Sequence, residues 1–164
     1  MYRGTRKARI HLEVNGVMSD FEVPVWHTLA ELLRDKMNLT GTKLGCNRAE
    51  CGACSVLLNG KLVFACTILA ASADGKKVET IEGISRDARW LPLQEALLKH
   101  DGLQCGFCTP GIMVALKALF EENPTPTLAD VRNGIAGNYC RCGAYLNIFE
   151  AALGAAEGVR RPVD

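Results

Sequence analysis

The stretch Gly41–Cys54, which reads GTKLGCNRAECGAC, decides the fold of the N-terminal half of this chain. It is a glycine-punctuated loop that carries Cys46, Cys51 and Cys54, and eleven residues separate the last of them from Cys66. A loop that wraps a metal cluster must turn several backbone N–H groups inward at sulfur. Glycine adopts the unusual conformations this requires at little steric cost. The loop and Cys66 are therefore predicted to hold one metal cluster.

Four more cysteines form a second set in the C-terminal half. Cys105, Cys108, Cys140 and Cys142 have the spacing C-x2-C-x31-C-x-C, and none of the eight cysteines is left over. A [2Fe-2S] cluster needs four soft thiolates, two for each iron. The first set, C-x4-C-x2-C followed by a distant cysteine, has the order found in plant-type ferredoxins. Two complete sets predict two [2Fe-2S] clusters and an electron relay.

Other uses of the cysteines fit the pattern less well. Disulfides would require an oxidising compartment, but no secretion signal is visible, and Cys140 and Cys142 are too close for an easy bridge. Zinc sites prefer paired C-x2-C knuckles, and the first set has one such pair with an extra cysteine upstream. A [4Fe-4S] site lacks its C-x2-C-x2-C run. The histidines His11, His27 and His100 are too scattered for Rieske ligation.

Length and composition restrict the class of protein. The 164 residues allow one large domain or two small ones, and 48% hydrophobic with 23% charged residues is typical of a globular chain. A net charge of +1 gives no indication of nucleic acid binding. No segment reaches the roughly 18 consecutive apolar residues of a membrane span, and no signal-peptide apolar region follows the N-terminal basic residues. We expect a cytoplasmic location, where thiols stay reduced.

The N-terminal half is predicted to be a small α+β unit. Apolar residues alternate with polar ones before Asn15-Gly16, which is typical of a strand that ends in a hairpin turn. Thr28 and Glu31 form a capping box that begins a helix with one apolar face. The remaining predicted strands are Val17–Val23, Ser55–Leu58, Lys61–Cys66 and Val78–Ile81.

The C-terminal half is predicted to be helical, and the polar stretch Glu82–Arg89 is interpreted as a linker. This divides the chain into domains at residues 1–82 and 83–164. The expected helices run from Leu91 to about Asp101-Gly102, from Thr109-Pro110 to Asn123-Pro124, from the capping box Thr127–Asp130 to about Ile135, and over Asn147–Glu157. The second cluster would lie among helix ends, where the positive end of a helix dipole favours an anion.

With both cysteine sets identified, almost the whole chain resembles a known family. That family is the iron–sulfur (small) subunit of molybdenum hydroxylases of the xanthine dehydrogenase/aldehyde oxidase type. The matching stretches are Gly41–Cys46, Glu50–Cys54, Ala65-Cys66, Gln104–Gly111 and Gly137–Cys142.

The resemblance implies a ferredoxin-like β-grasp domain followed by a four-helix domain. It also implies a complex with a large subunit that holds a molybdopterin cofactor, and usually with a subunit that holds FAD. In such enzymes the cluster of the helical domain lies nearer the molybdenum, and the β-grasp cluster lies nearer the flavin. Carried to this sequence, Gln104 and Cys142 would lie near the pterin, and the first cysteine set would face the exit side.

The expected function is therefore electron transfer for a molybdenum hydroxylase, with substrate oxidised on another chain. No hydrolase motif and no glycine-rich phosphate loop is present to suggest chemistry on this chain. Many relatives continue the C-R-C turn with Thr-Gly-Tyr, whereas Gly143-Ala144-Tyr145 resembles the bacterial aldehyde and N-heterocycle branches. A free ferredoxin-like carrier and a zinc-stabilised interaction module are the alternatives.

Overall fold

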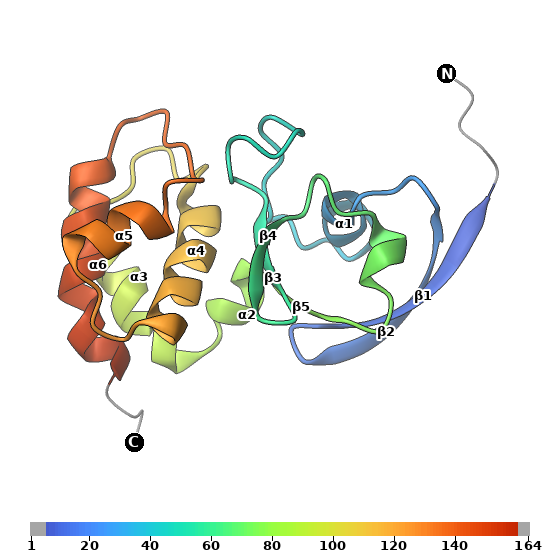
Figure 1. The fold of residues 1–164 in the computed structure, drawn as a ribbon, viewed down its shortest axis with the longest axis horizontal. Helices are drawn as coiled ribbons and strands as arrows, with labels where there is room; N and C mark the ends of the chain where they lie inside the picture. Colours follow the sequence, from blue (N-terminus) through green and yellow to red (C-terminus); the bar gives the residue numbers. More distant parts are fainter. Residues whose placement is uncertain (1–5, 161–164) are drawn as a thin grey trace.

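A computed structural model describes residues 6–160 and shows a mixed β-sheet beside a helical bundle (Figure 1). The strands are β1 (Lys7–Val14), β2 (Val17–Pro24), β3 (Ser55–Leu58), β4 (Lys61–Phe64) and β5 (Lys77–Glu79). The α-helices are α1 (Leu29–Glu31), α2 (Ile81–Ile84), α3 (Leu91–Lys99), α4 (Thr109–Glu122), α5 (Leu128–Gly134) and α6 (Tyr145–Arg160). The α+β class is confirmed, with a ferredoxin-like half first and a helical half of four longer helices second.

The sheet has the strand order β2-β1-β5-β3-β4, in which β1 and β5 are parallel and the other neighbours antiparallel. The predicted turn is confirmed, because Asn15 and Gly16 both have positive φ, at 51° and 81°. Ile10, Leu12 and Val14 alternate with more exposed residues and point into the core of this half. The β3–β4 hairpin lies at the edge of the sheet that faces the helices (Figure 1).

The helix after Thr28 begins as predicted but continues differently. The Thr28–Glu31 capping box is present, yet α1 covers one turn only and gives way to a π-helix over Leu32–Lys36. The Met37 N–H bonds the Leu32 carbonyl at 3.2 Å, five residues back. The Arg34 guanidinium then donates to the carbonyls of Thr40 and Thr42, at 2.9 and 2.7 Å. These bonds direct the chain into the first cysteine loop.

The prediction of a linker over Glu82–Arg89 is wrong, because most of this stretch forms two short helices. The helix α2 and a 3₁₀ turn over Ala88–Trp90 pack into the core of the helical half, where Ile84 and Trp90 are fully buried. The Glu82 carboxylate accepts the Gly41 N–H at 2.8 Å, so a polar side chain that suggested a linker anchors the segment instead. The division between residues 82 and 83 falls inside α2 and stays a prediction.

The helices of the C-terminal half follow the predicted order with small shifts at their ends. Cys108, and not Thr109, is the N-cap of α4, and α6 begins at Tyr145, two residues before the predicted start. Asn123 ends α4 in an extended conformation, as expected for a residue before proline. Helix α4 packs on β3, and α6 packs on α3. Among residues 6–160, no helix is both long enough and apolar enough to cross a bilayer.

The two halves are joined by an ion pair that involves a buried lysine and no cysteine. Lys117 of α4 is only 5% exposed, and its ammonium group lies 3.0 Å from the carboxylate of Glu79 at the end of β5. Glu121, one turn further along α4, contacts the same ammonium at 2.6 Å. The Trp90 ring lies 5.1 Å from it, within range of a cation–π interaction. Helix and sheet therefore meet through charge as well as apolar packing.

Candidate metal centres

The first cysteine loop turns main-chain N–H groups toward sulfur. The Cys46 Sγ accepts hydrogen bonds from the amides of Arg48, Glu50 and Cys51, at 3.5, 3.3 and 3.4 Å. The amide of Cys46 in turn donates to the Cys51 Sγ at 3.4 Å, and that of Ala49 donates to the Cys66 Sγ at 3.4 Å. Such a group of inward N–H donors forms a concave site for an anion. The loop is therefore shaped for a negatively charged cluster.

The backbone of this loop is unusual at more positions than its glycines. Gly52 has φ +66°, as glycine in the sequence suggested, but Asn47 and Ala49 also have positive φ, at 54° and 60°. A non-glycine residue in this region costs free energy and persists only where the surroundings require it. At Gly45, an added Cβ would lie 3.0 Å from the Cys51 Sγ. The backbone can therefore pass close to the sulfur atoms only with positive φ at Asn47 and Ala49 and with no side chain at Gly45.

The β3–β4 hairpin brings the other two thiols of the first set together. Cys54 directly precedes β3 and Cys66 follows β4, and the Ala65 N–H bonds the Cys54 carbonyl at 3.1 Å. Both cysteines are buried, and burial raises the pKa of the Cys54 thiol to about 12. By contrast, the backbone hydrogen bond from Arg48 lowers the pKa of Cys46 to about 7. Metal binding to this set must therefore displace a proton held on a buried thiol.

The second set lies at the starts of two helices. Cys105 and Cys108 precede α4, and Cys140 and Cys142 precede α6. The Sγ atoms of Cys105 and Cys142 are 3.5 Å apart, although the residues are 37 positions apart in sequence. Burial raises the pKa of Cys108 to about 12, while the backbone N–H of Phe107 lowers that of Cys105. Thiols from two distant segments thus converge on one site.

The turn that carries Cys140 is held by a residue that the sequence analysis did not identify as part of the site. The Tyr145 hydroxyl accepts the Cys140 N–H at 2.7 Å and donates to the Asn138 carbonyl at 3.2 Å. Burial opposes ionisation of Cys140, but backbone hydrogen bonds, chiefly from Ala144, leave its pKa lowered. Gly143, with φ +74°, allows this tight return. The sequence signal for Tyr145 is its position three residues after Cys142, where the Thr-Gly-Tyr pattern also has tyrosine.

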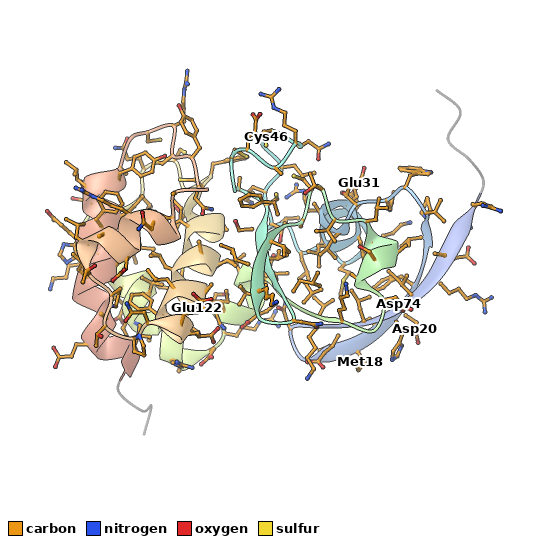
Figure 2. All side chains as sticks on the ribbon, viewed as in Figure 1. Met18, Asp20, Glu31, Cys46, Asp74 and Glu122 are labelled. Atoms are coloured by element: carbon orange, nitrogen blue, oxygen red, sulfur yellow. The ribbon has the colours of Figure 1, made fainter. Side chains whose placement is uncertain are left out.

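The two cysteine sets open onto one shared cavity of about 310 Å³. Its lining includes two thiols of each set and the two residues that flank Cys140. These residues are Cys46, Cys51, Cys105, Cys108, Tyr139 and Arg141. Arg141 is exposed and donates to the Tyr139 hydroxyl at 3.3 Å. The loops of both halves lie on the same side of the molecule, the upper side in Figure 1, and Cys46 stands at the outer end of its loop (Figure 2).

The predicted cysteines lie in two sets of four, one in each half, although among residues 6–160 no three or more of them are arranged to hold a single metal ion. Cys105 and Cys142 are exposed, and so is Gln104 beside them, whereas Cys54, Cys66 and Cys140 are buried. Eight soft thiol donors with inward N–H groups fit two iron–sulfur clusters, since hydrogen bonds to sulfur tune such centres. The arrangement can hold two redox centres in one chain.

Comparisons with known proteins agree with this division. Residues 12–80 match the family model described as "2Fe-2S iron-sulfur cluster binding domain". Residues 80–153 match a second model, described as "[2Fe-2S] binding domain". The two models meet at residue 80, just before α2.

Two curated relatives match over most of their own length. The chain is 45% identical to the nicotine 6-hydroxylase small subunit of Paenarthrobacter nicotinovorans over 149 residues, which are 91% of this chain and 90% of the relative. It is also 45% identical to a probable xanthine dehydrogenase subunit from Bacillus subtilis over 148 residues, or 90% and 84% of the two chains.

Solved structures show the same fold. A chain of quinoline 2-oxidoreductase from Pseudomonas putida 86 superposes with a TM-score of 0.90 at 38% identity, over 96% of this chain and 98% of that one. An aldehyde oxidoreductase from Desulfovibrio gigas matches with a TM-score of 0.84 at 40% identity, over 91% of this chain but only 17% of that one. In that protein the equivalent of this chain is one part of a much longer polypeptide.

Proposed function

Because this chain belongs to the family of small iron–sulfur subunits of molybdenum hydroxylases, we propose that it carries electrons between a molybdopterin site on a large subunit and an acceptor. The observation that carries the proposal is the presence of two sets of four cysteines, two thiols of each set lining one shared cavity. When bound, two [2Fe-2S] clusters supply one-electron transfer, which the side chains of this protein cannot perform alone.

The eight cysteines are the proposed cluster ligands. Cys46, Cys51, Cys54 and Cys66 hold one cluster, and Cys105, Cys108, Cys140 and Cys142 hold the other. The chain contributes more than thiolate, because its main-chain N–H groups donate to the sulfurs and its apolar cores exclude water from the buried ones. Hydrogen bonds and burial are two of the means by which a protein sets the potential of such a centre.

The helical half is the proposed side of contact with the large subunit. Cys105 and Cys142 are exposed there, and Gln104 is exposed next to them, so these residues are available to approach a pterin held by a partner. Two large apolar side chains, Phe107 and Leu146, are exposed on the same loops and helix start, at 46% and 69%. Exposed apolar side chains beside a site are suited to burial in an interface.

The first cysteine loop is the proposed exit toward FAD on a further subunit or toward another acceptor. Cys46 stands at the end of this loop (Figure 2), and Arg48 and Glu50 form an exposed ion pair at 2.8 Å beside it. Charged residues at such a tip are suited to recognise a partner surface. A cytoplasmic location accompanies the proposal, since the thiols must stay reduced until metal is inserted.

The test measures the metal content of the purified protein and identifies the chains that purify with it. We expect about four irons per chain, two distinct electron paramagnetic resonance signals after reduction, and co-purification with a large molybdenum-containing chain. Stoichiometric zinc with no visible absorption would indicate an interaction module, and two irons per chain would contradict the two-cluster assignment. A fully loaded chain that is recovered alone from its native cells would instead be a free carrier.

A further inference from the structure

A buried polar contact joins the two cysteine loops without involving any thiol. The Asn138 side chain is 3% exposed, and its Nδ2 donates to the Gly52 carbonyl at 2.9 Å and to the Ser55 hydroxyl at 3.3 Å. The Ser55 hydroxyl donates to the same Gly52 carbonyl at 2.7 Å. We call these three residues the Asn138 clamp. It connects segments more than 80 residues apart in the chain, one from each half.

The clamp lies where three backbones meet with no space between them. A Cβ added at Gly52 would clash with the Gly137 carbonyl, and one added at Gly111 would clash with the Gly52 carbonyl. Gly52 lies between two ligands of the first set, Asn138 lies two residues before Cys140, and Gly111 lies three residues after Cys108. The contact therefore joins the ligand-bearing backbones directly.

A main-chain hydrogen bond next to the clamp also joins the backbones that carry the ligands. The N–H of Tyr139 donates to the carbonyl of Cys51 at 2.9 Å. Cys51 is a predicted ligand of the first set, and Tyr139 directly precedes Cys140 of the second. Asn138 precedes Tyr139 and Gly52 follows Cys51. A shift of one backbone along the other would therefore break this hydrogen bond and the clamp together.

The chemistry of the clamp requires an amide donor at position 138. The Gly52 carbonyl accepts the Ser55 N–H at 3.1 Å, the Ser55 hydroxyl at 2.7 Å and the Asn138 amide at 2.9 Å, and it needs a donor from each. A carboxylate at position 138 would face this carbonyl with no proton to give, and burial makes that mismatch costly. Within residues 6–160 the Asn138 Oδ1 has no hydrogen-bond partner, so only the donor end of the side chain is used.

We propose that Asn138 is a positioning residue that sets the separation and relative orientation of the two clusters. This inference rests on the proposed two-cluster function. The halves are already joined by the packing of α4 on β3 and by the Lys117–Glu79 ion pair, so their association does not depend on the clamp alone. What the clamp adds is a fixed distance between the ligand loops. The magnetic coupling between two reduced centres and the rate of electron transfer from a reduced to an oxidised centre both depend steeply on that distance.

The test compares Asn138→Asp with Asn147→Asp in the complete complex with both clusters loaded. The Asn147 amide also donates to a backbone carbonyl, that of His100 at 2.8 Å, but at an exposed position. In the wild-type protein and in Asn147→Asp we expect magnetic splitting between the two reduced centres in low-temperature electron paramagnetic resonance. In Asn138→Asp we expect four irons and both signals, with the splitting lost and electron passage between the centres slowed.

Ser55→Ala keeps the inference testable if Asn138→Asp fails to retain its clusters. It removes one partner of the clamp, and the matched control is Ser72→Ala, where an exposed hydroxyl makes the same bond to a carbonyl three residues back at 2.7 Å. We expect a reduced splitting in Ser55→Ala and none of this change in Ser72→Ala.

Three results would overturn the positioning role, two in the variants and one in the wild type. One is a fully loaded Asn138→Asp complex with unchanged splitting and unchanged electron passage. The other, where that variant loses its clusters, is an unchanged splitting in Ser55→Ala. A wild-type protein with four irons but no splitting would also contradict it. A wild-type iron count other than about four by the ligand count would instead contradict the proposed function, so the two failures are distinguishable.

Discussion

The two cysteine loops solve the same chemical problem inside different frameworks. In each, one thiol near a tight turn collects backbone N–H groups from the next few residues, and the pKa values of Cys46 and Cys140 are lowered as a result. The first loop then rests on a β-hairpin that buries Cys54 and Cys66. The second rests on two helix starts that leave Cys105 and Cys142 exposed. Local turns provide the donors, and the surrounding fold decides which thiols face outward.

The largest expected effect separates the two loops by their place in the electron path. Cys108→Ser should disconnect the molybdenum site from every later acceptor, because this thiol belongs to the set proposed to face the large subunit. Cys51→Ser should still allow substrate to reduce the molybdenum site but should abolish delivery to the distant acceptor. Rapid-mixing spectroscopy with substrate measures both steps. Normal reduction of the distant acceptor by the Cys108 variant would reverse the proposed order.

A second prediction concerns the ion pair that joins the two frameworks. Lys117→Met leaves Glu79 and Glu121 without their cation, and breaking a buried pair costs about 3–5 kcal/mol. We expect about 2 kcal/mol, because both carboxylates are roughly one-third exposed and solvent screens them. Chemical denaturation gives the value, with exposed Lys99→Met as the control. An unchanged denaturation midpoint in Lys117→Met would mean that the ion pair does not stabilise the packing of the two halves.

A third prediction compares thiol reactivity in the metal-free chain. Thiolates react and thiols do not, so at pH 8 an alkylating reagent should modify Cys46 and Cys105 before Cys54 and Cys108. Peptide mass spectrometry gives the order. Equal rates at all four positions would show that the two loops do not keep their shape without metal.

The same pKa shifts predict opposite effects of pH on the stability of the metal-free protein. The lowered pKa of Cys46, about 7 against 9.0 unfolded, stabilises the fold above pH 9, and this stabilisation is lost as the pH falls through 7. The raised pKa of Cys54 and Cys108, about 12 for each, stabilises the fold below pH 9, and this is lost as the pH rises from 9 toward 12. Denaturation midpoints between pH 6 and 11 test the balance.

The smallest expected effect concerns one arginine on each loop. Arg141→Ala removes a planar donor beside the second set and should weaken assembly with the large subunit about fivefold, or about 1 kcal/mol. Arg48→Ala, which removes an exposed ion pair from the first loop, should leave that assembly unchanged. Binding of each loaded variant to the isolated large subunit gives the comparison. Equal affinities for the wild type and Arg141→Ala would reject the second loop as the docking face.

Much of this molecule follows from local sequence patterns. The Asn15-Gly16 turn, the capping boxes at Thr28 and Thr127 and the end of α4 before Pro124 depend on residues a few positions apart, and all are present. The eight cysteines can also be recognised as metal ligands from their spacing, because thiol is a soft ligand with few other uses in sets of four. Such features can be predicted because the interacting groups are close along the chain.

The features that the sequence did not predict depend instead on residues that are far apart along the chain. The segment Glu82–Arg89 looked like a linker because its charged residues hide one buried isoleucine, Ile84, whose partners lie on distant helices. The π-helix after α1 has no sequence signal, because the bonds from Arg34 to the carbonyls beyond it depend on where the cysteine loop lies. Lys117 resembles any solvent-facing lysine until Glu79 is brought beside it.

By itself, the sequence determined that this chain carries two sets of four thiols, one in an α+β half and one in a helical half. Only the tertiary structure decided that Asn138 bonds the other loop at Gly52 and that Cys46, Cys51, Cys105 and Cys108 line one cavity. The physical reason is range. Turns, caps and ligand spacing are set by neighbouring residues, whereas the contact between the loops exists only when the two halves pack against each other.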